Sequence, residues 1–126
     1  MNYPKHNFCP SCWMEIEPDT VNCPKCGYDL THFDKLSFEE KLISALGHPI
    51  RENRMMAVET LGKLRSVKAV AVFADILKNE SDYYLIREII LALKKIDCPE
   101  SRKMINELKT HRSNLVKNMI ETLNKP

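Results

Sequence analysis

The sequence predicts an all-α body, built as a short solenoid of helical hairpins, with a small cysteine-rich module in front of it. Two pairs of cysteines lie within the first 30 residues, whereas hydrophobic residues recur with a helical period after Thr31. A self-comparison at an offset of 32 residues aligns the core positions of two helices. We therefore expect a module over residues 1–30, a linker over 31–37 and a helical domain over 38–126.

Composition and charge restrict the class of protein. The 126 residues are 44% hydrophobic and 29% charged, as is usual for a globular protein. Neither an apolar amino-terminal signal nor a run of 18 apolar residues occurs, so we expect no secretion and no membrane span. We expect a cytoplasmic protein, in which cysteines stay reduced. Residues 1–47 carry four Lys/Arg and seven Asp/Glu (net −3), and residues 48–126 carry fifteen and ten (net +5).

The amino-terminal module contains two C-P-x-C pairs, separated by ten residues. Each pair places two sulfurs on one tight turn, whose backbone N–H groups can point at the sulfurs. Two such turns facing each other supply four ligands in the tetrahedral arrangement that zinc prefers in closed structural sites. Gly27 follows the second pair, where the turn often requires a positive φ. Between the pairs, residues 15–21 predict a short strand, a Pro-Asp turn and the start of a second strand. The predicted ligands of one structural Zn²⁺ are Cys9, Cys12, Cys23 and Cys26.

Size supports a metal in this module. A segment of about 30 residues is too short to build a sufficient hydrophobic core, whereas zinc at four thiolates supplies on the order of 10–16 kcal/mol. The module resembles the small zinc-ribbon domains at the ends of many bacterial and archaeal proteins, over about residues 7–30, through its cysteines, both prolines and Gly27. Trp13 departs from that resemblance, because a glycine more often follows the first pair as well.

The cysteine pattern has three alternative interpretations. Iron in a rubredoxin-like site is the main rival, although the ten-residue gap is short for that fold. Paired disulfides are disfavoured in a reducing compartment. A catalytic zinc is disfavoured because four cysteine ligands leave no open coordination position.

The body is predicted as a succession of helices. Residues 37–40 read S-x-x-E, a capping-box signature, and the helix that follows should end near Gly47, before Pro49. Because one later segment, residues 67–78, is apolar on nearly all sides, we expect that helix in the interior. The connections are short and show no strand-like alternation. The further helices are predicted over 51–64, 67–78, 83–96, 99–109 and 114–124.

The helices repeat. The stretch Arg54-x-x-Ala57-x-x-Thr60-Leu61-Gly62-x-Leu64 resembles HEAT-like repeats, particularly the group that includes phycobilisome lyases, and the resemblance covers about residues 38–124. It implies hairpins that bury their apolar faces against neighbouring hairpins. The second repeat has Lys94 in place of the glycine, so we expect its helix–helix turn to be built differently. An array with so few repeats is near the minimum for independent stability. We therefore expect the amino-terminal module to cap its first helix.

The remaining candidates for chemistry are one cysteine and four histidines. The odd cysteine, Cys98, precedes Pro99 at a helix start and takes the place of Ser66 in the previous repeat. We expect a capping or packing role for it; a reactive thiol is the alternative, without a base to nominate. No histidine is paired with a Glu or another His at a helical spacing suited to binding a metal, and the repeated His-Glu pairs of HEAT-like iron hydroxylases do not occur. We therefore expect all four histidines to be surface residues. The histidines are His6, His32, His48 and His111.

Candidate partner-binding residues fall into two groups. Among the aromatic residues, Trp13 either covers the metal or contacts a partner. Tyr83 and Tyr84 are either ordinary helix residues or interface anchors. The basic residues are either a solvated surface or one edge of the solenoid that receives an acidic partner or a phosphate backbone. These basic residues are Lys63, Arg65, Lys68, Lys94 and Lys95.

The sequence contains no recognisable nucleophile–base pair, phosphate-binding glycine loop or open metal site, and no small-molecule substrate is evident. The predicted function is a non-catalytic protein-interaction adaptor, or an accessory subunit of a larger assembly. The alternative is an accessory protein that binds nucleic acid through the ribbon and the basic edge. A lyase related to phycobilin lyases is the third possibility, and only the generic repeat supports it.

Overall fold

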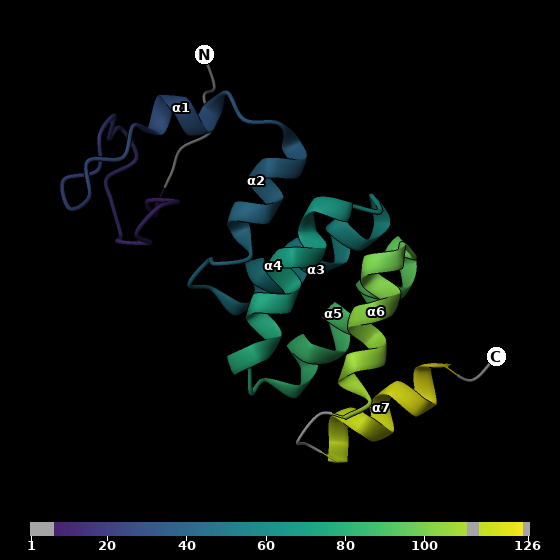
Figure 1. The fold of residues 1–126 in the computed structure, drawn as a ribbon. Coiled ribbons are helices and arrows are strands. Elements are labelled where there is room, and N and C mark those ends of the chain that lie inside the picture. Colours follow the sequence, from purple (N-terminus) through teal and green to yellow (C-terminus); the bar gives the residue numbers. More distant parts are fainter. Residues whose placement is uncertain (1–6, 111–113, 125–126) are drawn as a thin grey trace. The chain divides into compact units, whose positions relative to one another are not determined.

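A computed structural model describes residues 7–110 and 114–124 (Figure 1). The chain divides into two compact units, Met1–Arg54 and Met55–Pro126. The described residues form seven helices and two isolated β-bridges, with no longer strand among them. The predicted all-α class is confirmed. No helix within the described ranges combines the length and apolar character that crossing a lipid bilayer requires.

The first unit begins with two tight turns, which we call the knuckles, over residues 8–15 and 22–29. Each is closed by one bridge, Phe8 to Glu15 and Asn22 to Asp29. The strands predicted within 15–21 are wrong, because the pairing stops after one bridge: Glu15 pairs with Phe8, and Ile16 and Val21 each add a single backbone hydrogen bond, to Asn7 and Leu30. The buried residues of the module are Cys9, Ile16, Cys23 and Leu30.

Two helices follow the knuckles in the first unit. The short helix α1, Leu30–Asp34, was not predicted and occupies part of the expected linker. The Asp29 carboxylate caps it by accepting a hydrogen bond from the Thr31 N–H (2.9 Å). Helix α2, Phe38–Ala45, begins as predicted, because the Ser37 hydroxyl oxygen accepts from the Glu40 N–H (3.1 Å).

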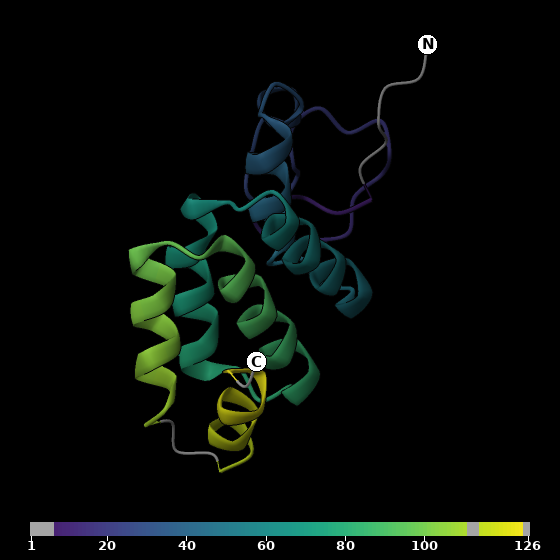
Figure 2. The same cartoon turned by 90° about the vertical axis from the view of Figure 1, so that its right-hand side faces the viewer.

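The second unit is a layered set of helices with its core around α5 (Figure 2). The unit boundary falls inside helix α3, Arg51–Lys63, and the later helices are α4, Val67–Asn79; α5, Tyr83–Ile96; α6, Pro99–Leu108; and α7, Asn114–Asn124. Helix α5 contacts α4, α6 and α7. Its buried residues are Leu85, Ile86, Ile89, Ile90, Ala92, Leu93 and Ile96.

The predicted interior position of α4 is wrong. This helix buries one face, through Ala69, Val70, Phe73 and Leu77, while Val67 is 54% exposed. The all-round apolar character of residues 67–78 comes largely from alanine and valine, which lose little by partial exposure. Helix α5 is the central helix of the unit instead.

The two helical hairpins of the second unit, α3–α4 and α5–α6, repeat one another at the predicted offset. Arg65 and Asp97 take the left-handed conformation at equivalent positions, with φ of 53° and 46°. Ser66 caps α4 by accepting from the Ala69 N–H (3.3 Å), and Cys98 caps α6 by accepting from the Ser101 N–H through its Sγ (3.4 Å). The capping role predicted for Cys98 is confirmed.

The two helix–helix turns nevertheless close differently, as predicted. After α3 the Ser66 N–H donates to the Leu61 carbonyl (3.1 Å), which is a Schellman arrangement. After α5 the Cys98 N–H donates to the Ser101 hydroxyl (2.9 Å), and only a single bond from the Asp97 N–H closes the turn. The cause is the hydroxyl of Ser101, which an alanine replaces in the first repeat.

Gly62 is needed for the packing of α3 against α5 and not for the turn after α3. A Cβ at this position would lie 2.9 Å from both the Cα and the Cβ of Ala92, which is closer than real side chains approach. The glycine lets α3 approach the backbone of α5 closely. The equivalent residue of the second repeat, Lys94, is exposed.

Candidate metal centre

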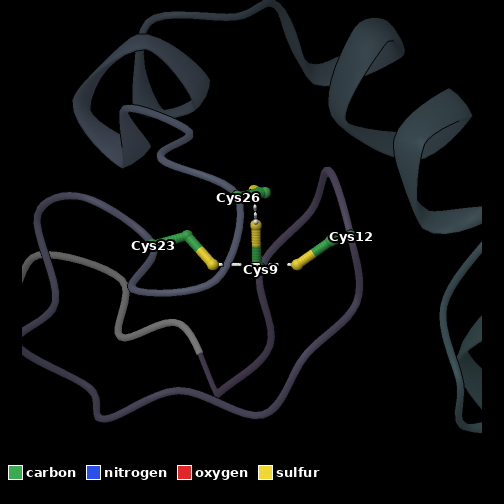
Figure 3. Close-up of side chains that lie close together, drawn as sticks. All are labelled: Cys9, Cys12, Cys23 and Cys26. Atoms are coloured by element: carbon green, nitrogen blue, oxygen red, sulfur yellow. Dashed lines mark hydrogen bonds between the residues drawn. The ribbon is translucent and has the colours of Figure 1, made fainter.

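The two knuckles bring four cysteine sulfurs together (Figure 3). All four Sγ atoms lie within 4.8 Å of one another; Cys9 and Cys26 are 3.6 Å apart, and Cys12 and Cys23 are 3.7 Å apart. Four sulfurs at about 2.3 Å from one ion, at the corners of a tetrahedron, would be about 3.8 Å apart. These four cysteines could hold one metal ion, and the sulfur spacing fits a tetrahedral one.

The knuckles are copies of each other at an offset of 14 residues. In each, the residue after the second cysteine donates its N–H to the first cysteine's carbonyl, from Trp13 to Cys9 (2.7 Å) and from Gly27 to Cys23 (2.8 Å). Backbone N–H groups also point at the sulfurs as predicted, since Ser11 and Lys25 donate to Cys9 and Cys23 (3.4 Å each). A self-comparison at offset 14 would have revealed this duplication from sequence.

The backbone also prepares the thiols for ionisation. Hydrogen bonds from the N–H groups of Cys26 and Lys25 outweigh burial and lower the pKa of Cys23 to about 6. At Cys12 the Met14 N–H lowers the pKa, but burial and the neighbouring thiols together raise it to about 11. The Cys23 thiolate therefore forms readily, while ionisation of Cys12 is opposed by burial and by the neighbouring thiols. A divalent cation would reverse this opposition by replacing the shared protons.

Trp13 occupies an unusual backbone position. Its φ of 63° is the counterpart of the 81° at Gly27, and such values are rare for a bulky residue. The indole lies against the segment after α2: its Nε1 would be 2.8 Å from a Cβ built at Gly47, and its ring centroid is 5.2 Å from that of His48. Trp13 thereby joins the first knuckle to the segment that follows α2. The predicted contact between the amino-terminal module and this helix is therefore present.

The expectation of a plain surface residue is wrong for His48. Its ring is half-buried between Phe8 and Trp13, with both centroid distances at 5.2 Å. The backbone around it is also held, because the Arg54 guanidinium donates to the His48 carbonyl (2.8 Å). His32 is exposed, as expected, and His6 and His111 lie outside the described residues. Sequence reasoning missed His48 because its partners are 35 and 40 residues away in the chain.

The candidate partner-binding residues are surface residues. Tyr83 and Tyr84 are 37% and 65% exposed at the start of α5, with their rings edge to face at 5.8 Å. The basic side chains lie beside equivalent turns of the two hairpins, where Lys63 also pairs with Glu59 (3.2 Å). The exposed basic residues are Lys63, Arg65, Lys68, Lys94 and Lys95.

Fold and site together define a helical-repeat protein with a tetracysteine module at its amino-terminal end. The chain belongs to the family of HEAT repeats, whose model matches residues 28–94. The match covers α1 to most of α5. Comparison with the curated proteins gives no match, and comparison with solved structures gives none either. HEAT repeats are helical scaffolds, most often for protein interaction.

Proposed function

We propose that this protein is a non-catalytic interaction adaptor, or an accessory subunit of a larger assembly, that carries one structural zinc ion. The observation that carries the proposal is the pairing of a closed four-sulfur cluster with HEAT repeats. Within the described ranges, neither part places a nucleophile next to a base. Both parts offer surfaces on which a partner protein can bind. The cytoplasm is the proposed location, because the cluster needs reduced thiols.

Zinc is the metal favoured by the donor set. Four thiolates around a tetrahedral ion form a closed structural site, in which the metal supplies cross-linking of two knuckles that lack a core of their own. Elemental analysis of protein purified without added metal should return one equivalent of zinc. One equivalent of iron, with the visible absorption of an iron–thiolate site, would replace zinc by a rubredoxin-like centre.

The adaptor role is tested by partner recovery. The tagged full chain, expressed at native level, should retain a stoichiometric protein partner through cross-linking and washing at raised salt. A matched sample in which Tyr83 and Tyr84 are replaced by serine tests whether these exposed rings contribute to the contact. Recovery of nucleic acid alone would contradict the proposal.

The alternative is a nucleic-acid-binding accessory protein. It rests on the five exposed basic residues beside the two hairpin turns. If they contact phosphates, affinity for short DNA or RNA should fall steeply with salt, because released counterions drive such binding. The acidic amino-terminal region opposes this alternative, and we expect weak binding with little dependence on sequence.

A further inference from the structure

The first unit contains a half-open cavity of about 240 Å³ that is distinct from the sulfur cluster, and we call it the Trp13 cavity. It lies between the first knuckle, α1, α2 and the beginning of α3. Its volume falls below the roughly 300 Å³ at which pockets for whole small molecules begin. It therefore fits one large side chain better than a complete cofactor or nucleotide. The lining residues are Asn7, Phe8, Pro10, Trp13, Phe33, Lys41, Ser44, Ala45, His48, Ile50 and Asn53.

The walls of the Trp13 cavity are mainly aromatic. Phe8 and Trp13 come from the first knuckle and Phe33 from α1, and the His48 ring contacts both knuckle side chains. Trp13 takes the same left-handed backbone conformation as Gly27 in the second knuckle, and from this position of the turn its indole lines the cavity.

The chemistry of the cavity is that of an anion acceptor. Lys41 is the only Lys, Arg, Asp or Glu that lines it, with its ammonium 5.9 Å from the Phe33 ring centroid. Within the described residues, Lys41 has no acidic partner, and neither the Ser44 hydroxyl nor the Trp13 indole N–H has an acceptor. Residues 1–54 hold six Lys/Arg and eight Asp/Glu, so an acid-free cavity stands out in a unit of net charge −2.

We propose that the Trp13 cavity binds a segment of a protein partner in which a large apolar side chain stands next to a carboxylate. The side chain would fill the aromatic cavity, and the carboxylate would pair with Lys41. This inference rests on the proposed adaptor function and specifies the partner's chemistry. A phosphodiester ligand is disfavoured, because a single cation in a negatively charged unit gives it little electrostatic compensation.

The test uses three short peptides and the metal-loaded full chain labelled with ¹⁵N. The peptides are acetyl-Glu-Phe-Glu-amide, acetyl-Gln-Phe-Gln-amide and acetyl-Lys-Phe-Lys-amide, and uridine monophosphate serves as the nucleotide probe. Trp13 is the only tryptophan, so its indole N–H gives a single resonance that reports on the cavity. We expect the acidic peptide to shift this resonance and to bind at least about threefold more tightly than the Gln peptide, as one partly exposed charge pair provides.

Two variants with the same charge change make the test specific. Lys41→Glu should reverse the preference, so that the Lys peptide binds more tightly than the Glu peptide. Lys35→Glu changes an exposed lysine at the end of α1 that does not line the cavity, and it should leave the preference as in the wild type. A ¹H–¹⁵N spectrum that is otherwise unchanged shows that each variant is folded.

Three results would overturn the proposal: no shift of the Trp13 indole with any peptide, equal affinity for the Glu and Gln peptides, or a shift with the nucleotide alone. The proposed adaptor function is judged separately by partner recovery. If Lys41→Glu still recovers the partner in full, the Trp13 cavity is excluded as the contact while the adaptor function stands.

Discussion

The two units of this protein are ordered by different forces. Among the described residues of the amino-terminal module, 7–30, only four side chains are buried, Cys9, Ile16, Cys23 and Leu30, and two of these are candidate metal ligands. Helix α5 alone buries seven apolar residues against its neighbours. Hydrophobic burial therefore accounts for the order of the second unit and cannot account for that of the knuckles.

The difference also appears in the backbone. Both units contain a duplication, at an offset of 14 residues in the knuckles and 32 in the hairpins. In the hairpins the left-handed residues, Arg65 and Asp97, end helices. In the knuckles, Trp13 and Gly27 turn the chain so that two sulfurs face the same point. The short duplication thus brings four sulfurs together, whereas the long one gives two hairpins that pack on each other.

Metal removal is the prediction with the largest expected effect. Cys23→Ser, or a strong chelator, should abolish amide protection over residues 7–30, because a metal free energy on the order of 10–16 kcal/mol is lost. Protection in α4 to α7 should persist, because their burial does not depend on the metal. Hydrogen exchange measured by mass spectrometry resolves the two units.

The matched control is the fifth cysteine. Cys98→Ser removes a thiol that lies outside the cluster, and we expect full metal content and unchanged protection over residues 7–30. If the chelator also removed the protection of α5, the two units would not be independently ordered.

The second prediction tests the packing of the helical unit. Gly62→Ala should lower the free energy of unfolding by about 1–3 kcal/mol, because the new methyl would meet Ala92 at 2.9 Å. The better helix propensity of alanine, about 0.5–1 kcal/mol, works in the opposite direction and is smaller. Urea unfolding at saturating metal measures the difference, and metal content should not change.

Lys94→Ala is the control, because Lys94 occupies the equivalent position of the second repeat and is exposed. We expect a change within about 0.5 kcal/mol. If both substitutions lowered the free energy of unfolding equally, the loss would be due to the position in the repeat and not to the contact with Ala92.

Much of this structure could be predicted from sequence, because its signals are local. The start of α2 follows from the Ser37 cap, and the bounds of α5 follow from its apolar period. The four sulfurs follow from two C-P-x-C pairs, whose spacing leaves few other arrangements.

The failures involve contacts between distant residues. Helix α4 has an apolar sequence on all sides, yet only its neighbours determine which face is buried. His48 gives no local signal, because its role depends on Phe8 and Trp13 across the module. The Trp13 cavity is likewise formed by segments that only the fold brings together.

The third prediction compares two helix caps in equivalent positions. Ser66→Ala should destabilise the second unit by about 1 kcal/mol, because the Ala69 N–H at the start of α4 loses its acceptor. Cys98→Ser should change stability by less than about 0.5 kcal/mol, since serine fills the same role in the first repeat. Thermal unfolding of the metal-loaded protein measures both. A larger loss for Cys98→Ser would indicate that the sulfur contributes packing beyond the cap.

The smallest predicted effect is a pH dependence at the junction of the first unit. Burial of the ring, and then the charge of Arg54, lower the pKa of His48 below its usual 6.5. The unfolded chain therefore binds more protons between the two pKa values, so the His48 contribution is complete above pH 6.5 and is lost as pH falls toward the folded pKa.

The thiols also protonate in acid, so the measurement must isolate His48. The difference in stability between the wild type and His48→Gln should shrink as pH falls below 6.5, because thiol protonation affects both proteins alike and cancels. His32→Gln, at an exposed histidine whose ring lies against Tyr28 instead, is the matched control for the loss of an imidazole outside the contact with Phe8 and Trp13. If His48→Gln kept a constant difference from pH 8 to pH 5, the contact of His48 with Phe8 and Trp13 would not require a neutral ring. The contact between the first knuckle and the segment after α2 would then depend on the packing of the rings and not on the charge of His48.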